Sequence, residues 1–338
     1  MNDFVKEVSS QGTALMDLVH FYRNEGHEIL DYLKELFDKN NFKRLIFTGM
    51  GSSLSATETI RGFLVSNKKE TLAYSSSELL NYMFNLIDSE TLVFAVSQSG
   101  NSREVLELIR NISKITPVIG ITNNNDSPLA QQVPITLPLK AGIENSITSK
   151  SYENTILLLN IISHHLLGQL DSPFWNEVST VIDWINEWMS DLSSKTNPLF
   201  HFARNSILFD MIAEGPSLAT AKQLSLAYRE GLNNCSAVWE LADYAHGQYH
   251  SSKMGRDYLA QMFVPFIEKQ STSERMIRYI LEHDGRVIVY SVTELGQEEG
   301  LRTVKMPNVR HSLIPLVESA VSETLLGLLL GPNWTKKR

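Results

Sequence analysis

Cysteine is almost absent: Cys235 is the only one among 338 residues. A single thiol excludes a disulfide framework and any metal site built from several cysteines, and it is typical of a reducing compartment. The N-terminal stretch MNDFVKEVSS lacks the apolar segment of a signal peptide, so we expect a cytoplasmic protein. Long uninterrupted apolar runs are absent too. The most apolar stretch, residues 312–331, contains a proline and two glutamates and predicts a buried helix rather than a membrane span.

Positive charge is also scarce. Thirty Lys and Arg against 38 Asp and Glu give a formal charge of −8, so we expect neither a nucleic-acid partner nor a membrane surface. No G-x-x-x-x-G-K-[ST] occurs, and Leu54 stands where the third glycine of a G-x-G-x-x-G would follow Gly49 and Gly51. Because no H-E-x-x-H or clustered Cys/His pattern occurs either, we expect no bound metal.

What the sequence contains is an alternation of short apolar runs and amphipathic segments. Helical spacing of apolar residues predicts two helices over residues 13–39, interrupted near 24–26. The following part predicts strands at 45–47, 71–74, 92–96, 118–121 and 135–137, and helices at 53–65, 103–112 and 126–131. This alternation predicts a parallel sheet with helices on both faces. Two long helices are predicted next, at about 147–168 and 174–193, the second opened by Pro173.

The alternation then resumes in the second half. Strands are predicted at 206–209, 258–264, 287–292 and 303–306, and helices at 217–231, 273–283 and 313–330. The segment GSSLSAT at 51–57 also matches GPSLATA at 215–221 in its Gly, Ser and Leu. We therefore predict an α/β protein with two doubly wound, parallel-sheet subdomains in tandem. The expected parts are N-terminal helices (1–40), a first subdomain (41–170), a linking helix (171–200) and a second subdomain (201–332).

Two loops rich in small and hydroxyl residues follow neighbouring predicted strands. SQSGNS spans residues 97–102, and GMGSS spans residues 49–53. In an open parallel sheet, ligands bind at the carboxyl ends of strands, where helix N-termini present free N–H groups and a partial positive charge. Such loops can bind a phosphate without any lysine. The alternative is that Ser99, Asn101 or Ser102 only caps the helix that follows.

These two loops, together with AGIENSITSKSY at 141–152, resemble the sugar isomerase (SIS) domain family. The resemblance covers about residues 40–330, and the tandem arrangement is similar to the isomerase half of glucosamine-6-phosphate synthase and to stand-alone fructosamine-phosphate deglycases. It implies a flavodoxin-like fold for both subdomains. The third motif is one residue shorter than the family pattern between Glu144 and Lys150. The resemblance implies that the following residues bind a phosphorylated sugar: Gly51, Ser52, Ser53, Ser97, Gln98, Ser99, Ser102, Ile147, Thr148 and Ser149.

The second half carries a candidate acid–base pair. Glu230 and His246 are separated by sixteen residues, the spacing of the family's catalytic pair, and "ELADYAHG" resembles its E-x-x-H-G-P motif. By this resemblance Glu230 moves the proton between C1 and C2, and His246 assists ring opening from the partner subunit of a homodimer. A carboxylate and an imidazole suit these proton transfers. The alternatives are a solvated glutamate near a helix end and a histidine that caps a turn.

The sequence also departs from the synthase. We expect no glutaminase activity, and the sequence reads GPNWTKKR where the resemblance implies a longer tail that supplies a lysine acting at the sugar C2. Lys336 or Lys337 could replace that lysine, although no motif indicates it. We therefore expect an isomerase that interconverts the aldose and ketose forms of a phosphorylated amino sugar, such as glucosamine 6-phosphate, or of fructose 6-phosphate. The reaction could include release of an amine, and we expect it to need no cofactor. The alternatives are a fructosamine-phosphate deglycase and a non-catalytic phosphosugar-binding protein.

Overall fold

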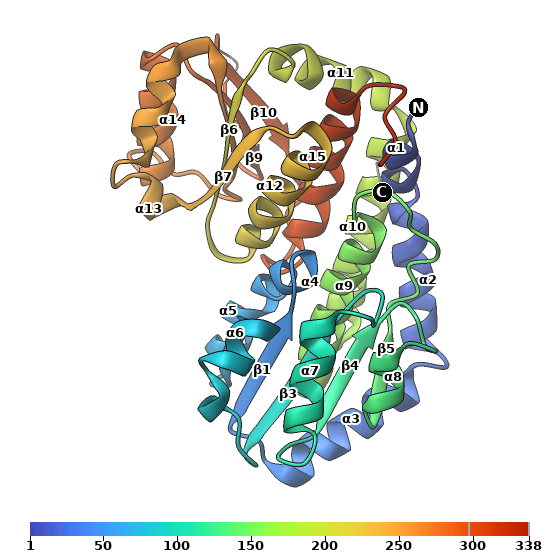
Figure 1. Cartoon of the computed structure of the whole chain (residues 1–338). Helices are drawn as coiled ribbons and strands as arrows, with labels where there is room; N and C mark the ends of the chain where they lie inside the picture. Colours follow the sequence, from blue (N-terminus) through green and yellow to red (C-terminus); the bar gives the residue numbers. More distant parts are fainter. Residues whose placement is uncertain (297, 337–338) are drawn as a thin grey trace. The chain divides into compact units, whose positions relative to one another are not determined.

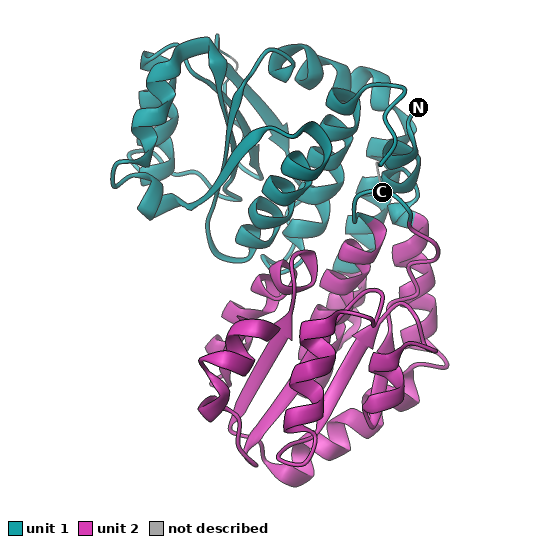
Figure 2. Ribbon diagram, viewed as in Figure 1, with its two compact units in different colours: residues 1–12, 145–149, 177–338 teal, residues 13–144, 150–176 magenta. Residues whose placement is uncertain are grey.

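The computed structural model describes residues 1–296 and 298–336. The chain divides into two compact units, which are coloured separately in Figure 2. Unit 1 comprises Met1–Gly12, Asn145–Ser149 and Glu177–Arg338, and unit 2 comprises Thr13–Glu144 and Lys150–Asn176. Each unit therefore combines segments that are far apart in the sequence, and each is described separately below.

Unit 2 contains a five-stranded parallel sheet in the order β2-β1-β3-β4-β5 (Figure 1). Its strands are β1 (Arg44–Gly49), β2 (Glu70–Ser75), β3 (Thr91–Val96), β4 (Val118–Thr122) and β5 (Ile135–Pro138). Every residue of the central strand β3 is buried, as expected for a strand covered by helices on both faces. The five strands predicted for this half are confirmed.

The helices of unit 2 follow the predicted alternation with one correction. They are α3 (His27–Asn40), α4 (Ser52–Ser55), α5 (Glu58–Ser66), α6 (Ser76–Asn81), α7 (Arg103–Ile112), α8 (Pro128–Gln132) and α9 (Lys150–Leu166), while α2 (Gln11–Arg23) and α10 (Ser172–Ser190) cross the boundary between units. The single helix predicted over 53–65 is wrong, because α4 ends before Thr57. The Thr57 hydroxyl donates to the carbonyl of Leu54 at 2.7 Å, a local bond that competes with continuation of the helix.

Unit 1 contains a second five-stranded parallel sheet, in the order β10-β9-β8-β6-β7. Its strands are β6 (Leu208–Ala213), β7 (Cys235–Glu240), β8 (Tyr258–Phe263), β9 (Arg286–Ser291) and β10 (Leu301–Lys305). Strand order and direction repeat those of the first sheet, with β6 in the place of β1. The strand predicted at 206–209 in fact runs over β6, and β7 was not predicted because this edge strand is largely half-exposed and lacks an apolar run.

The helices of unit 1 are α1 (Asp3–Val8), α11 (Leu192–Ala203), α12 (Leu218–Leu232), α13 (Leu241–Tyr244), α14 (Thr272–Glu282) and α15 (Ile314–Leu330), with 3-10 turns η2 (Gly215–Ser217) and η3 (Gln248–Asp257). The apolar stretch near the end of the chain forms α15, which is buried along nearly its whole length, as predicted. Among the described residues, no helix combines the length and apolar character needed to cross a membrane.

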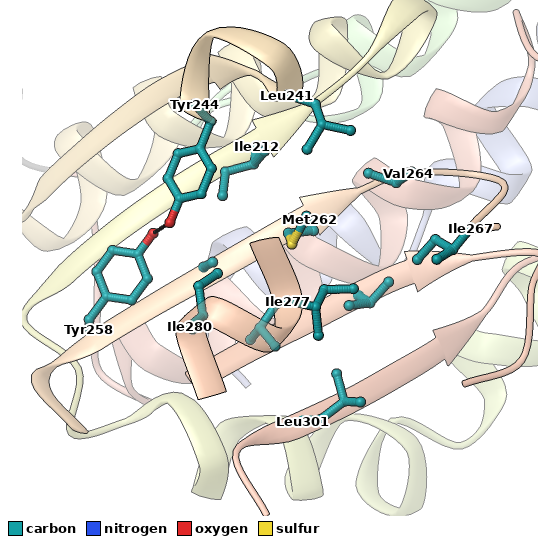
Figure 3. Packing of buried hydrophobic residues seen from close by; sticks show 13 residues of the cluster. Ile212, Leu241, Tyr244, Tyr258, Met262, Val264, Ile267, Ile277, Ile280 and Leu301 are labelled. Carbon is teal, nitrogen blue, oxygen red and sulfur yellow. Dashed lines mark hydrogen bonds between the residues drawn. The ribbon is translucent and has the colours of Figure 1, made fainter. Parts of the chain in front are cut away.

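A polar network lies beside the core of unit 1. Tyr244 and Tyr258 point their hydroxyls at each other in Figure 3, 2.7 Å apart. Asp210 of β6 accepts hydrogen bonds from the Tyr258 hydroxyl at 2.8 Å and from the Trp239 indole N–H at 3.0 Å. Burial raises the pKa of Asp210, and these two donors partly offset the rise. The hydrogen bonds from Tyr258 and Trp239 therefore allow Asp210, a polar residue that interrupts the apolar pattern of β6, to stay buried within this strand.

We expect Asp210→Ala to lower the free energy of unfolding by roughly 2–4 kcal/mol, because the substitution removes the acceptor of the buried Tyr258 hydroxyl and of the partly buried Trp239 indole N–H. Asp210→Asn should cost less, since its amide oxygen still accepts one bond. Chemical denaturation followed by circular dichroism measures both values. Equal losses for Ala and Asn would show that the carboxylate oxygens do not support this network.

Candidate functional site

The SQSGNS loop lies at the carboxyl end of β3, between that strand and α7. The hydroxyls of Ser97 and Ser102 are 2.9 Å apart, and the Ser99 hydroxyl accepts a hydrogen bond from the backbone N–H of Asn101 at 3.2 Å. Gly100 has φ +65°, and a Cβ there would lie 2.0 Å from Ser127 Oγ, so this turn requires glycine. The loop is thus a compact turn held by its own serines.

Ser102 occupies the N-cap position of α7, but its side chain makes no capping hydrogen bond. The interpretation that Ser102 caps the helix is therefore wrong, because its hydroxyl is directed to Ser97 instead. The first turn of α7 keeps backbone N–H groups without a side-chain acceptor, and the helix dipole adds partial positive charge there. These features can hold an anion.

The GMGSS loop lies at the carboxyl end of β1, and β1 and β3 are neighbours in the sheet. Gly51 has φ +52°, which turns the chain from the strand into α4. The structure therefore brings Gly51, Ser52 and Ser53 to the same edge of the first sheet as Ser97, Gln98, Ser99 and Ser102. None of the hydrogen bonds in the described part of the chain uses the hydroxyl of Ser52 or Ser53, so both can donate to a ligand.

A cavity of about 790 Å³ adjoins the SQSGNS loop within unit 2. Its lining combines Gln98, residues of α2, and the loops after β4 and β5. Asn123 connects these parts: its backbone N–H donates to the Gln98 carbonyl at 2.9 Å, and its side chain bonds Ala141 and Gly142. A volume of this size is typical of small-molecule sites. The sequence analysis did not identify this cavity, because its walls come from segments about 120 residues apart.

Ile147, Thr148 and Ser149 belong to unit 1, not to the unit of the two loops above. The Thr148 carbonyl accepts a hydrogen bond from the Gln223 side chain of α12 at 2.9 Å. A Cβ on Gly231 would lie 3.0 Å from Ile147 Cδ1, so the absence of a side chain at Gly231 allows this close packing. The segment 147–149 therefore packs along α12, the helix that carries Glu230.

Glu230 lies in the last turn of α12 and is partly exposed. Lys336 Nζ lies 3.5 Å from Glu230 Oε2 and 3.2 Å from the Ser146 carbonyl oxygen. The sequence offered no motif for Lys336, because 106 residues separate it from Glu230. Lys337 lies outside the described residues. One ammonium and one carboxylate thus meet beside the segment 147–149.

His246 is exposed and follows α13 at the carboxyl end of β7. The turn before it is well supported, since Glu240 caps α13 by accepting from the backbone N–H groups of Ala242 and Asp243, and Tyr244 is buried. Glu230 precedes the start of β7, whereas His246 follows its end (Figure 1). A six-residue strand spans about 20 Å. Within one chain, the whole length of β7 therefore lies between the helix end that carries Glu230 and the turn that carries His246.

No group of three or more His, Cys, Asp or Glu residues in the described part of the chain could hold a metal ion. The predicted site residues are serines, amides, a carboxylate, an imidazole and backbone N–H groups. These groups can bind an oxyanion by hydrogen bonds and can move protons.

The chain is similar to several known proteins. The SIS domain family matches residues 40–162. An isomerizing glutamine–fructose-6-phosphate aminotransferase from Methanocaldococcus jannaschii is 24% identical over 328 residues, covering 95% of this chain and 28% of that protein. This chain spans about a quarter to about half of the length of the curated relatives it matches.

Two solved structures share the fold. The C-terminal domain of glucosamine-fructose-6-phosphate aminotransferase from Francisella tularensis superposes with a TM-score of 0.85 at 18% identity, covering 98% of this chain and 97% of that one. Tagatose-6-phosphate ketose/aldose isomerase from Escherichia coli gives a TM-score of 0.78 at 16% identity, covering 96% and 93%. Residues 40–162 therefore match the SIS domain model, the chain is similar in sequence to the isomerase region of isomerizing glutamine–fructose-6-phosphate aminotransferases, and it shares the fold of the two solved structures.

Proposed function

We propose that this protein is a phosphosugar isomerase that interconverts an aldose phosphate and a ketose phosphate, with a phosphorylated amino sugar or fructose 6-phosphate as substrate. The observation that carries the proposal is the SQSGNS loop, where Ser102 stands at the N-cap of α7 without capping it. The uncapped helix start and the hydroxyls of the neighbouring GMGSS loop form a neutral set of donors for a phosphate ester.

In this proposal the phosphate binds to Ser52, Ser53, Ser97, Ser99 and Ser102, with Gln98 beside them. Hydrogen bonds to a charged group contribute roughly 1.5–3 kcal/mol each, so three or four are enough for micromolar to millimolar binding after the ordering cost. A dianion held by dipoles also fits a chain with a net charge of −8, in which a broad cationic surface is not expected.

Glu230 is the proposed base that removes the proton from one of the sugar carbons C1 and C2 and returns it to the other. His246 is the proposed proton carrier for ring opening. A catalytic group must come within about 3 Å of its proton, whereas β7, a six-residue strand about 20 Å long, lies along the chain between Glu230 and His246. We therefore propose a homodimer in which each site combines Glu230 of one chain with His246 of the other.

Lys336 supports a role for the Glu230 region in carbonyl chemistry. Its ammonium lies beside the Glu230 carboxylate, and the resemblance to the synthase implies a lysine acting at C2. In this chain Lys336 is the proposed equivalent. Segment 147–149 then forms the wall beside both groups, since it packs on α12 next to Gly231.

The test is hydrogen exchange in D₂O. A working base exchanges deuterium into C1 or C2 of glucosamine 6-phosphate or fructose 6-phosphate, which mass spectrometry detects. If phosphosugars raise the melting temperature in a thermal-shift assay but no deuterium is incorporated, the protein binds phosphosugars without isomerising them. If a panel of phosphosugars shows neither binding nor deuterium incorporation, the proposal is wrong.

We expect the double substitution Ser99→Ala and Ser102→Ala to weaken phosphosugar binding at least about tenfold, because it removes two hydroxyls from the proposed phosphate site. Isothermal titration calorimetry measures the affinity. Ser113→Ala, at the other end of α7, is the matched control and should leave affinity unchanged. An unchanged affinity in the double variant would locate the phosphate elsewhere.

A second candidate function is a fructosamine-phosphate deglycase, favoured by the cavity of about 790 Å³ that shares Gln98 with the loop. It offers room for a substrate larger than a hexose phosphate. Release of free amine from a phosphorylated sugar–amine adduct, without exchange into the simple phosphosugars, would support this candidate over the isomerase.

A further inference from the structure

The second sheet has a loop that corresponds to the GMGSS loop of the first sheet. The first loop follows β1 and the second loop follows β6, and these two strands occupy the same position in their sheets. Gly51 and Gly215 both have a left-handed backbone, with φ of +52° and +55°, and GSSLSAT matches GPSLATA around them. Within these segments Ser217 stands in the place of Ser53. The second loop therefore has the backbone turn and hydroxyl of the proposed phosphate site.

The two loops differ in what their hydroxyls contact. In the second loop the Ser217 hydroxyl donates to Glu318 Oε1 at 2.8 Å, and the Thr220 hydroxyl donates to Glu318 Oε2 at 2.9 Å. Glu318 lies in α15 and is fully buried. Each carboxyl oxygen thus accepts one hydrogen bond, from Ser217 at the end of η2 or from Thr220 in the first turn of α12. A side chain of the protein occupies the place that a ligand oxyanion is proposed to take in the first loop.

Nearby charges reinforce this assignment. Burial and the neighbouring Glu240 raise the pKa of Glu214, which directly precedes Gly215. Burial also raises the pKa of Glu318 to about 7, although its two hydroxyl partners lower it. Tyr290 is a further titratable group that interacts with the Glu318 charge. An edge that already carries three carboxyl groups disfavours an external dianion.

Helix α15 contacts α12 at both ends. Glu318 holds the start of α12 through Ser217 and Thr220. At the other end a Cβ on Gly231 would lie 2.6 Å from Leu330 Cδ2, so α15 packs closely beside the residue that follows Glu230. The two helices therefore run side by side in the same direction, and a shift at the start of α12 moves its end as well.

We propose that Glu318 is a positioning residue: its carboxyl group fills the second loop and sets the position of α12, and thereby of Glu230. The inference rests on the proposed function for the role of Glu230 as the base. A misplacement of about 1 Å at a reacting group can cost roughly 100-fold in rate, so a small shift of α12 has a measurable effect.

The kinetic test compares Glu318→Leu with Glu318→Gln. Glu318→Leu should lower kcat at least about tenfold and change KM less than about threefold, because the proposed phosphate site lies on the other sheet. Glu318→Gln should keep kcat within about threefold, since an amide can accept from one hydroxyl and donate to the other. Glu323→Gln is the matched control, a buried glutamate of α15 that accepts from Gln11 instead of the loop.

A second measurement does not need turnover. Hydrogen–deuterium exchange of peptides covering 218–232 should become faster in the Glu318→Leu variant, including at residues 228–232, and should stay at the wild-type rate in Glu318→Gln and Glu323→Gln. The double variant Ser217→Ala and Thr220→Ala should reproduce the effect of Glu318→Leu. Unchanged exchange at 228–232, or an equal loss of kcat in Glu318→Gln and Glu318→Leu, would overturn the positioning role. Absence of phosphosugar turnover in the wild type together with the expected exchange pattern would instead remove only the proposed function.

Discussion

Glu230→Gln is expected to abolish hydrogen exchange between a phosphosugar and solvent while leaving the affinity for that sugar nearly unchanged. The amide has the shape of the carboxylate, and its oxygen can still accept from Lys336, whose Nζ lies 3.5 Å from Glu230 Oε2. It cannot take a proton from carbon, and a general base contributes roughly 10²–10⁴ in rate. Exchange rates in D₂O and calorimetric affinities together measure the effect.

Glu282→Gln is the matched control, because Glu282, like Glu230, is an exposed glutamate in the last turn of a helix of unit 1, and it lies in no proposed site. It should exchange hydrogen at the wild-type rate. If Glu230→Gln retains exchange, Glu230 is not the base, and Lys336 becomes the first group to substitute. If affinity falls together with exchange, Glu230 contributes to binding as well as to proton transfer.

Mixing two inactive variants, Glu230→Gln and His246→Ala, is expected to restore activity to about one quarter of the wild-type level. In a symmetric homodimer each proposed site takes Glu230 from one chain and His246 from the other. Half of randomly re-formed dimers contain one chain of each kind, and one of their two sites has both groups intact. The physical basis is β7, a strand about 20 Å long that lies along the chain between the two residues.

The variants are mixed after partial unfolding so that chains can exchange, and the double variant Glu230→Gln and His246→Ala mixed with wild type is the control. In that control, neither site of a mixed dimer has both groups intact. The activity should therefore be lower than the activity of the same amount of wild-type protein diluted without the variant. An active His246→Ala protein would remove His246 from the site. No restoration, with mixed dimers present by size-exclusion chromatography of tagged chains, would place both groups in one chain's site.

Much of the fold could be predicted from the sequence, because a strand buried on both faces must be apolar throughout. β3 reads TLVFAV, the predicted strand 92–96 covers all of it except Thr91, and the loop after it was identified by its serines. Prediction failed where another interaction outweighed the local pattern. Asp210 stays buried in β6 because Tyr258 and Trp239 donate to it, and Thr57 ends α4 by bonding to Leu54.

The sequence by itself determined the described strands other than β7 and the loops at the carboxyl ends of β1 and β3, since these depend on local composition, whereas the candidate pair Glu230 and His246 came from the resemblance to the SIS family and stays a prediction. Only the tertiary structure decided that Lys336 reaches Glu230, that segment 147–149 packs on α12, and that Glu318 fills the second loop. Each of these contacts joins residues 75 or more positions apart. Local pattern carries no signal for such pairs, because the folding of the chain between them sets their distance.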